Sequence, residues 1–94
     1  MVETLIFPKA RVERLHQALR RYCQQVLQDP SAAVEILPEA EFPDMLLAPI
    51  VVSSAFNGML ETERQISVWK FMRNDPGVTR DDLSSISRII TRAD

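Results

Sequence analysis

Nucleophilic catalysis would most simply use the chain's one cysteine and one histidine, Cys23 and His16. Both lie in a segment with a helical pattern, and their separation of seven positions corresponds to about 10.5 Å along a helix axis. A histidine that activates a thiol must lie within about 3 Å of it. We therefore expect no catalytic dyad, and interpret Cys23 as a small buried thiol and His16 as a residue at the boundary of the apolar stripe.

Acidic side chains are the next groups that could do chemistry, as acid–base pairs or as ligands for a hard cation. They are concentrated in a proline-bracketed connection and at helix starts, where solvation and the helix dipole account for them. Neither glycine, Gly58 or Gly77, belongs to a phosphate-binding loop motif. We therefore predict that the protein is not an enzyme and has no metal or cofactor of its own. The acidic residues are Glu35, Glu39, Glu41, Asp44, Glu61, Glu63, Asp81 and Asp82.

Arginines could instead contact the phosphates of a nucleic acid, with Tyr22 or Trp69 as a stacking surface. The more ordinary interpretation is a solvated helix face that balances the acidic connections. A net charge of −2 argues against generic nucleic-acid binding, although it is compatible with a local basic face. Nucleic acid is therefore the second functional hypothesis. Its candidate contacts are Arg11, Arg14, Arg21, Arg88 and Arg92.

Length and composition indicate one globular domain over residues 1–94, with flexible ends at 1–8 and 93–94. The chain has 94 residues, of which 46% are hydrophobic and 26% charged. A single cysteine excludes an intramolecular disulfide and favours a reducing compartment. The sequence has no signal-peptide pattern, and its apolar runs are far shorter than the roughly 20 residues that cross a bilayer. We expect a cytoplasmic protein without membrane contact, either a monomer or a weak homodimer.

Hydrophobic periodicity predicts a first helix over residues 9–28, which ends before Pro30. Strands are predicted over 32–37 and 45–53, joined by a proline-bracketed connection. Pro49 cannot donate a ladder hydrogen bond, so we expect the second strand to be at a sheet edge or to carry a bulge. The inward residues of the first helix are Val12, Leu15, Leu19, Tyr22 and Val26.

A second helix is predicted over residues 61–73, with Thr62 as its cap. The tail has two possible interpretations, a short helix from Thr79 or a strand over 86–92. The resulting order, α-β-β-α-(α)-β, predicts an α+β domain with helices on one face of a small three-stranded sheet. The inward residues of the second helix are Ile66, Val68, Trp69 and Met72.

The stretch from Ile50 to Trp69 resembles the signature region of BolA-like proteins. That signature has a strand ending in Val-Ser, a Phe-x-Gly turn, and a helix that opens on Arg-His-Arg before an aliphatic–aromatic pair. The resemblance covers residues 9–92 and implies a fold similar to class II KH domains, with a final strand. It also implies partnership with monothiol glutaredoxins, often through a shared [2Fe–2S] cluster, and DNA binding in some members. The matching residues are Phe56, Gly58, Arg64, Val68 and Trp69.

Three positions depart from the family pattern. Gln65 replaces the histidine that ligates the cluster, Met59 replaces a lysine, and Ile66 replaces the second arginine. Iron in such a cluster needs thiolate or imidazole ligands, so we do not expect a shared [2Fe–2S] cluster. The loss of two positive charges also weakens the case for nucleic acid.

We therefore expect a non-enzymatic interaction or regulatory protein that binds a protein partner such as a monothiol glutaredoxin. Phe71 is a further candidate for an exposed apolar contact, with core packing as the alternative. The candidate partner-binding residues are Phe56, Gly58, Met59, Leu60, Arg64 and Gln65.

Overall fold

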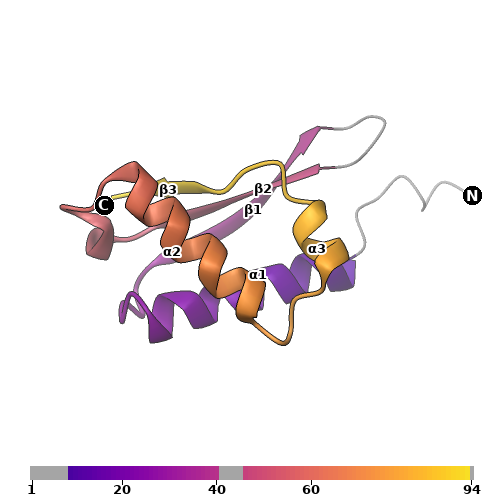
Figure 1. Ribbon diagram of the computed structural model, residues 1–94, viewed down its shortest axis with the longest axis horizontal. Coiled ribbons are helices and arrows are strands. Elements are labelled where there is room, and N and C mark those ends of the chain that lie inside the picture. The colour runs from indigo at the N-terminus through magenta and orange to yellow at the C-terminus, as the bar shows by residue number, and fades with distance from the viewer. Residues whose placement is uncertain (1–8, 41–45, 94) are drawn as a thin grey trace, which may run out of the picture.

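The computed structural model describes residues 9–40 and 46–93. The predicted α+β order is confirmed, and the tail contains both a short helix and a strand (Figure 1). The predicted flexible segment 1–8 and most of the predicted connection 38–44 lie outside the described residues. The elements are α1 (Lys9–Gln25), β1 (Ala33–Ala40), β2 (Leu46–Val52), the 3₁₀ turn η2 (Ser54–Phe56), α2 (Glu61–Asn74), α3 (Arg80–Ser84) and β3 (Ile90–Arg92).

The three strands form one mixed sheet in the order β1-β2-β3. β1 runs antiparallel to β2, with Ala33 opposite Val52. β3 runs parallel to β2 over three residue pairs, from Ile50↔Ile90 to Val52↔Arg92. β2 is therefore the central strand, and the expectation that Pro49 marks a sheet edge or a bulge in this strand is wrong.

A gap in the pairing between β2 and β3 explains how the central strand tolerates Pro49. The N–H of Leu47 donates to Ser85 C=O at 2.8 Å, and the N–H of Ser53 donates to Arg92 C=O at 3.0 Å. Backbone N–H groups point alternately to the two sides of a strand. The nitrogen of residue 49 therefore points toward β3, as those of Leu47 and Ser53 do. That position lies between the isolated bridge at Leu47 and the ladder that begins at Ile50, so the missing N–H interrupts no ladder pair.

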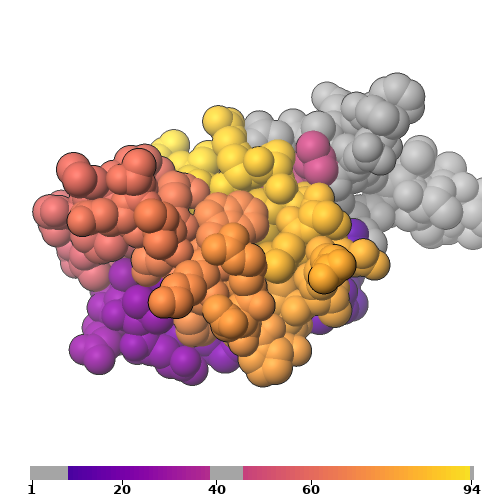
Figure 2. Space-filling view, viewed as in Figure 1, coloured from indigo at the N-terminus to yellow at the C-terminus, as the bar shows by residue number. Residues whose placement is uncertain are grey.

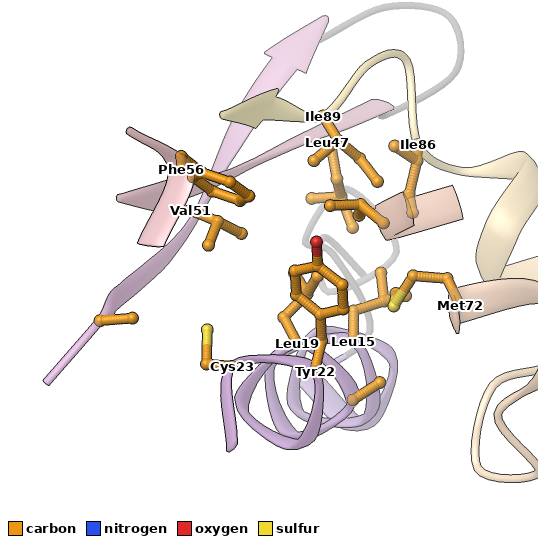
Figure 3. Packing of buried hydrophobic residues seen from close by; sticks show 13 residues of the cluster. Leu15, Leu19, Tyr22, Cys23, Leu47, Val51, Phe56, Met72, Ile86 and Ile89 are labelled. Carbon is orange, nitrogen blue, oxygen red and sulfur yellow. The ribbon is translucent and has the colours of Figure 1, made fainter. Parts of the chain in front are cut away.

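The hydrophobic core lies between the sheet and the two long helices, which pack on the same side of it (Figure 1). In Figure 3, side chains of α1 face Leu47, Val51 and Phe56 across this layer. The hydroxyl of Tyr22 is hydrogen-bonded to Ser67 Oγ at a distance of 2.8 Å, so the polar end of this buried side chain has a partner. Cys23 is buried as predicted, and burial raises the pKa of its thiol. The fully buried residues of α1 are Leu15, Ala18, Leu19, Tyr22 and Cys23.

The first helix ends at Gln25, three residues before the predicted end at 28. Gln28 adopts a left-handed φ of 53°, and the N–H of Asp29 closes the helix terminus on Cys23 C=O at 2.9 Å. Val26 consequently lies beyond the helix with 47% of its surface exposed, so its predicted inward position is wrong.

Two predictions about α2 are also wrong. Ile66 is 66% exposed, because the stripe that faces the sheet begins at Gln65 and continues through Val68, Trp69 and Met72 at helical spacing. Thr62 does not cap this helix. The helix starts after Leu60, whose N–H donates to the Glu63 carboxylate at 2.8 Å.

Candidate functional site

The residues that carry the family resemblance meet at one corner of the fold, where β2 leads through η2 into α2. The hydroxyl of Ser53 accepts the N–H of Ala55 at 3.0 Å and donates to Asp29 at 2.6 Å. Hydrogen bonds from Ser53 and Ser31 lower the pKa of the Asp29 carboxyl. Gly58 then adopts a φ of 86°, a left-handed conformation that glycine takes without strain.

Arg64 joins three elements at this corner. Its guanidinium lies 5.6 Å from the centroid of the Phe56 ring. It donates to the C=O groups of Phe56 at 3.3 Å and Thr91 at 3.4 Å, and it lies 3.6 Å from the Glu61 carboxylate. The side chain is only 17% exposed. Arg64 therefore connects η2, α2 and β3 and offers little surface to a partner.

Gln65 is held in place by both ends of its amide. Its nitrogen donates to Ile89 C=O at 2.8 Å and to the Glu61 carboxylate at 2.9 Å. Its oxygen accepts the indole N–H of Trp69 at 3.1 Å. These bonds attach α2 to the chain entering β3, so the Gln65 side chain has a structural role in this fold.

The donors at this corner do not fit an iron ligand set. An amide engaged in three hydrogen bonds is a poor substitute for imidazole. Cys23 is buried in the core, and His16 lines a hollow of about 430 Å³ between α1 and β1, a different part of the fold. Within residues 9–40 and 46–93, no cluster of three or more His, Cys, Asp or Glu residues could hold a metal ion.

The six predicted partner-binding residues divide into an internal and an external set. Phe56 is fully buried, and Met59 is partly buried against the core. With Arg64 and Gln65 they hold the corner together. Gly58 and Leu60 are exposed, Leu60 by 67%. Of the six predicted partner-binding residues, therefore, only Gly58 and Leu60 offer most of their surface to a partner.

Within the motif region, Ile66 is an exposed apolar residue that sequence reasoning placed in the interior. The spacing of Val68, Trp69 and Met72 could have revealed it, because their stripe continues to position 65 and residue 66 is rotated from that position by about 100° on a helix. Phe71 is half-buried and forms an edge contact with Tyr22, with ring centroids 5.6 Å apart. We call the exposed residues Gly58, Leu60 and Ile66 together the motif surface. Segment 54–74, which contains it, occupies the left and centre of the face in Figure 2.

Three candidate nucleic-acid contacts are engaged by buried carboxylates. Arg14 donates to both oxygens of Asp82, at 2.7 and 2.8 Å, and Arg11 donates to the same carboxylate at 3.1 Å. Arg21 pairs with Asp75 through two hydrogen bonds of 2.8 and 2.9 Å. Hydrogen bonds from Arg14 and Arg21 hold the pKa of Asp82 and Asp75, respectively, below the usual range.

The candidate arginines do not share one face. Arg11, Arg14 and Arg21 lie on α1. Arg92 is on the opposite side of the sheet, because the preceding Thr91 is buried toward α2 and side chains alternate along a strand. Arg88 is exposed in the segment before β3. Arg92 therefore cannot join the α1 arginines in one continuous track for a phosphate backbone.

No family model, curated protein or solved structure matches the chain. Within the part of the chain that the structure describes, no helix has the length and apolarity needed to span a bilayer. The site must therefore be interpreted from its own chemistry. It combines a hydrogen-bonded internal frame with two exposed large apolar side chains, Leu60 and Ile66.

Proposed function

We propose that the protein is a non-enzymatic, BolA-like interaction or regulatory protein that binds a protein partner, such as a monothiol glutaredoxin, through the motif surface. The element order supports this proposal, since the resemblance implies a final strand after the helical tail and β3 is present. The joining of Phe56 and Arg64 at one corner also supports it, because these residues match the family motif.

The observation that carries the proposal is the exposure of large apolar side chains within the motif. Residues 9–40 and 46–93 expose four large hydrophobic side chains, and two of them, Leu60 and Ile66, belong to the motif surface. Ile66 stands where the family pattern has an arginine. An isoleucine 66% exposed at such a position favours an apolar protein contact over an anionic ligand.

This proposal includes no iron–sulfur step. Gln65 is engaged in bonds to Ile89, Glu61 and Trp69, so its amide is not available as an iron ligand. Partner binding would then depend on shape and apolar contact.

Nucleic-acid binding is the alternative function, and the ion pairs of α1 weaken it. Arg11 and Arg14 neutralise Asp82, and Arg21 neutralises Asp75. To release Arg14 or Arg21 for strong phosphate contacts, a buried carboxylate would have to lose its bidentate partner, which is costly. Arg11 shares Asp82 with Arg14 and is less constrained.

Calorimetric titration of the full chain into a purified monothiol glutaredoxin tests the proposal. We expect saturable binding that Ile66→Lys weakens at least about tenfold, because burying an isoleucine contributes about 1.5–3 kcal/mol. Val26→Lys is the matched control, since Val26 is an exposed aliphatic residue outside the motif surface. It should leave the affinity unchanged.

Two results would contradict the proposal. One is the absence of binding at concentrations up to about 200 µM, a level that detects weak complexes. The other is equal binding by the wild type and Ile66→Lys. Salt-sensitive binding of single-stranded or duplex DNA in the same buffers would favour the alternative function.

A further inference from the structure

The sheet has a second face, turned away from the helices, which we call the open sheet face. Its members follow from the register, because residues paired across strands share a face. Ala33 pairs with Val52, and Val52 pairs with Arg92. The neighbouring residue Val51 is in the core, so this row points the other way. The open sheet face comprises Ala33, Glu35, Leu37, Ala48, Ile50, Val52, Ile90 and Arg92.

This face is mostly apolar, in contrast to the solvent side of an ordinary antiparallel sheet. β2 has the sequence LLAPIVV, with no polar side chain on either face. A strand with one wet face normally alternates apolar and polar residues, whereas a continuous apolar run is typical of a strand covered on both sides. Ile50 and Val52 are half-buried and lie outside the core cluster, and Leu37 is 42% exposed. The pattern indicates that something covers this face.

Charges at the two edges of the face identify the covering molecule. Glu35 lies on β1, and Arg92 lies on β3, with the neutral strand β2 between them. A twofold axis parallel to the strands would place β1 of one molecule over β3 of a second. Each Glu35 would then face an Arg92 of the other copy, offset by about two residues or roughly 6.6 Å along the strands, within reach of both long side chains.

We infer that the open sheet face is the interface of a twofold symmetric homodimer. The apolar centre is self-complementary, and the charged edges select one of the two possible face-to-face axes. An axis perpendicular to the strands would place β1 over β1 and Glu35 near its own copy. This interface is separate from the motif surface, so it does not rest on the proposed partner binding.

The free edge of β1 is a less favourable place for self-association. Its outward backbone groups belong to Val34 and Ile36, because their neighbours pair with β2. Antiparallel pairing of two copies across that edge, centred on residue 35, would set two glutamates directly opposite each other. Pro38 has no N–H to extend the ladder. Both features are typical of a protected edge.

The size of the face predicts a weak dimer. Three strands span about 14 Å and seven residues about 23 Å, which corresponds to less surface than the roughly 800 Å² per partner of a stable interface. We therefore expect a monomer at low micromolar concentration and a dimer at several hundred micromolar.

Sedimentation equilibrium of the full chain and its charge variants tests the inference. Glu35→Arg and Arg92→Glu should each weaken dimerisation at least about tenfold, since each places like charges opposite each other twice. An equimolar mixture of the two variants should recover wild-type association, because every facing pair is again of opposite charge. The double variant should also dimerise.

Ile50→Lys and Ile66→Lys form a matched pair of isoleucine variants. The first should abolish the dimer, and the second, on the motif surface, should leave it intact. A monomer at all concentrations up to about 500 µM would overturn the inference. So would a dimer that is insensitive to Glu35→Arg, or a mixture of the charge variants that associates no better than either alone. A wild-type chain that dimerises but does not bind a monothiol glutaredoxin would count against the proposed function only.

Discussion

Asp82→Asn is expected to lower the free energy of unfolding by about 3 kcal/mol, because it removes the charge that pairs two arginines. The Asp82 side chain is fully buried and accepts hydrogen bonds from Arg11 and Arg14. It also accepts the N–H of Thr79 at 3.1 Å, which caps α3. The variant would therefore weaken both the junction of α1 with α3 and the start of α3. Urea unfolding measures the effect.

Asp81→Asn is the matched control in the same helical turn. Asp81 is exposed, so its variant should change the free energy of unfolding by less than about 0.5 kcal/mol. Equal effects of the two substitutions would contradict the assigned role of Asp82.

The pH dependence of stability is a second measurement on the variants Asp82→Asn and Asp81→Asn. The pKa of Asp82 is lower in the folded than in the unfolded protein, chiefly because of hydrogen bonds from Arg14. Its contribution is therefore fully present well above the unfolded value of about 3.9 and is lost as the pH falls below it. Asp82→Asn should show a smaller decrease in stability from pH 7 to pH 3 than Asp81→Asn. An identical decrease would contradict the ion-pair account.

Phe56→Ala is expected to lower the free energy of unfolding by about 3–5 kcal/mol, because it leaves a cavity in the core. Phe56 has no exposed surface, packs in the core and supports the Arg64 guanidinium. Phe56→Leu keeps most of the apolar volume and should cost about 1–1.5 kcal/mol. The loss in Phe56→Leu measures the effect of removing the ring, and the additional loss in Phe56→Ala measures the effect of the cavity.

The same two variants separate a structural role of Phe56 from a binding role. Because the ring does not reach the surface, the folded Phe56→Leu protein should bind a monothiol glutaredoxin with wild-type affinity. A cost below about 1 kcal/mol for Phe56→Ala would contradict the burial described here. A selective loss of binding in folded Phe56→Leu would return Phe56 to the partner-binding set.

Local patterns predicted the elements well, because their causes lie within a few residues of each other. Thr79 accepts the N–H of Asp82 at 3.0 Å, and such a cap can be recognised from spacing alone. The order of the strands was less accessible. Pro49 is compatible with the central strand only because the pairing of β2 with β3 is interrupted there, and that gap depends on how a distant segment returns.

The exposure of the candidate residues was predicted only in part. A motif identifies residues that occur together, but it does not tell which of them face the solvent. Phe56 and Gln65 turned inward, whereas Ile66 turned outward through its helical phase. The arginine pairs were also beyond sequence reasoning, because Arg14 and Asp82 are separated by 68 residues and Arg21 and Asp75 by 54.

Binding through the motif surface can be measured as the footprint of a monothiol glutaredoxin on the backbone amides of the ¹⁵N-labelled chain. We expect perturbed signals for residues 58–66, with the largest changes at Leu60 and Ile66, and unperturbed signals for Ile50 and Val52 on the open sheet face. Unchanged signals throughout at saturating partner, or changes confined to the arginine side of α1, would contradict the claim that the motif surface binds this partner.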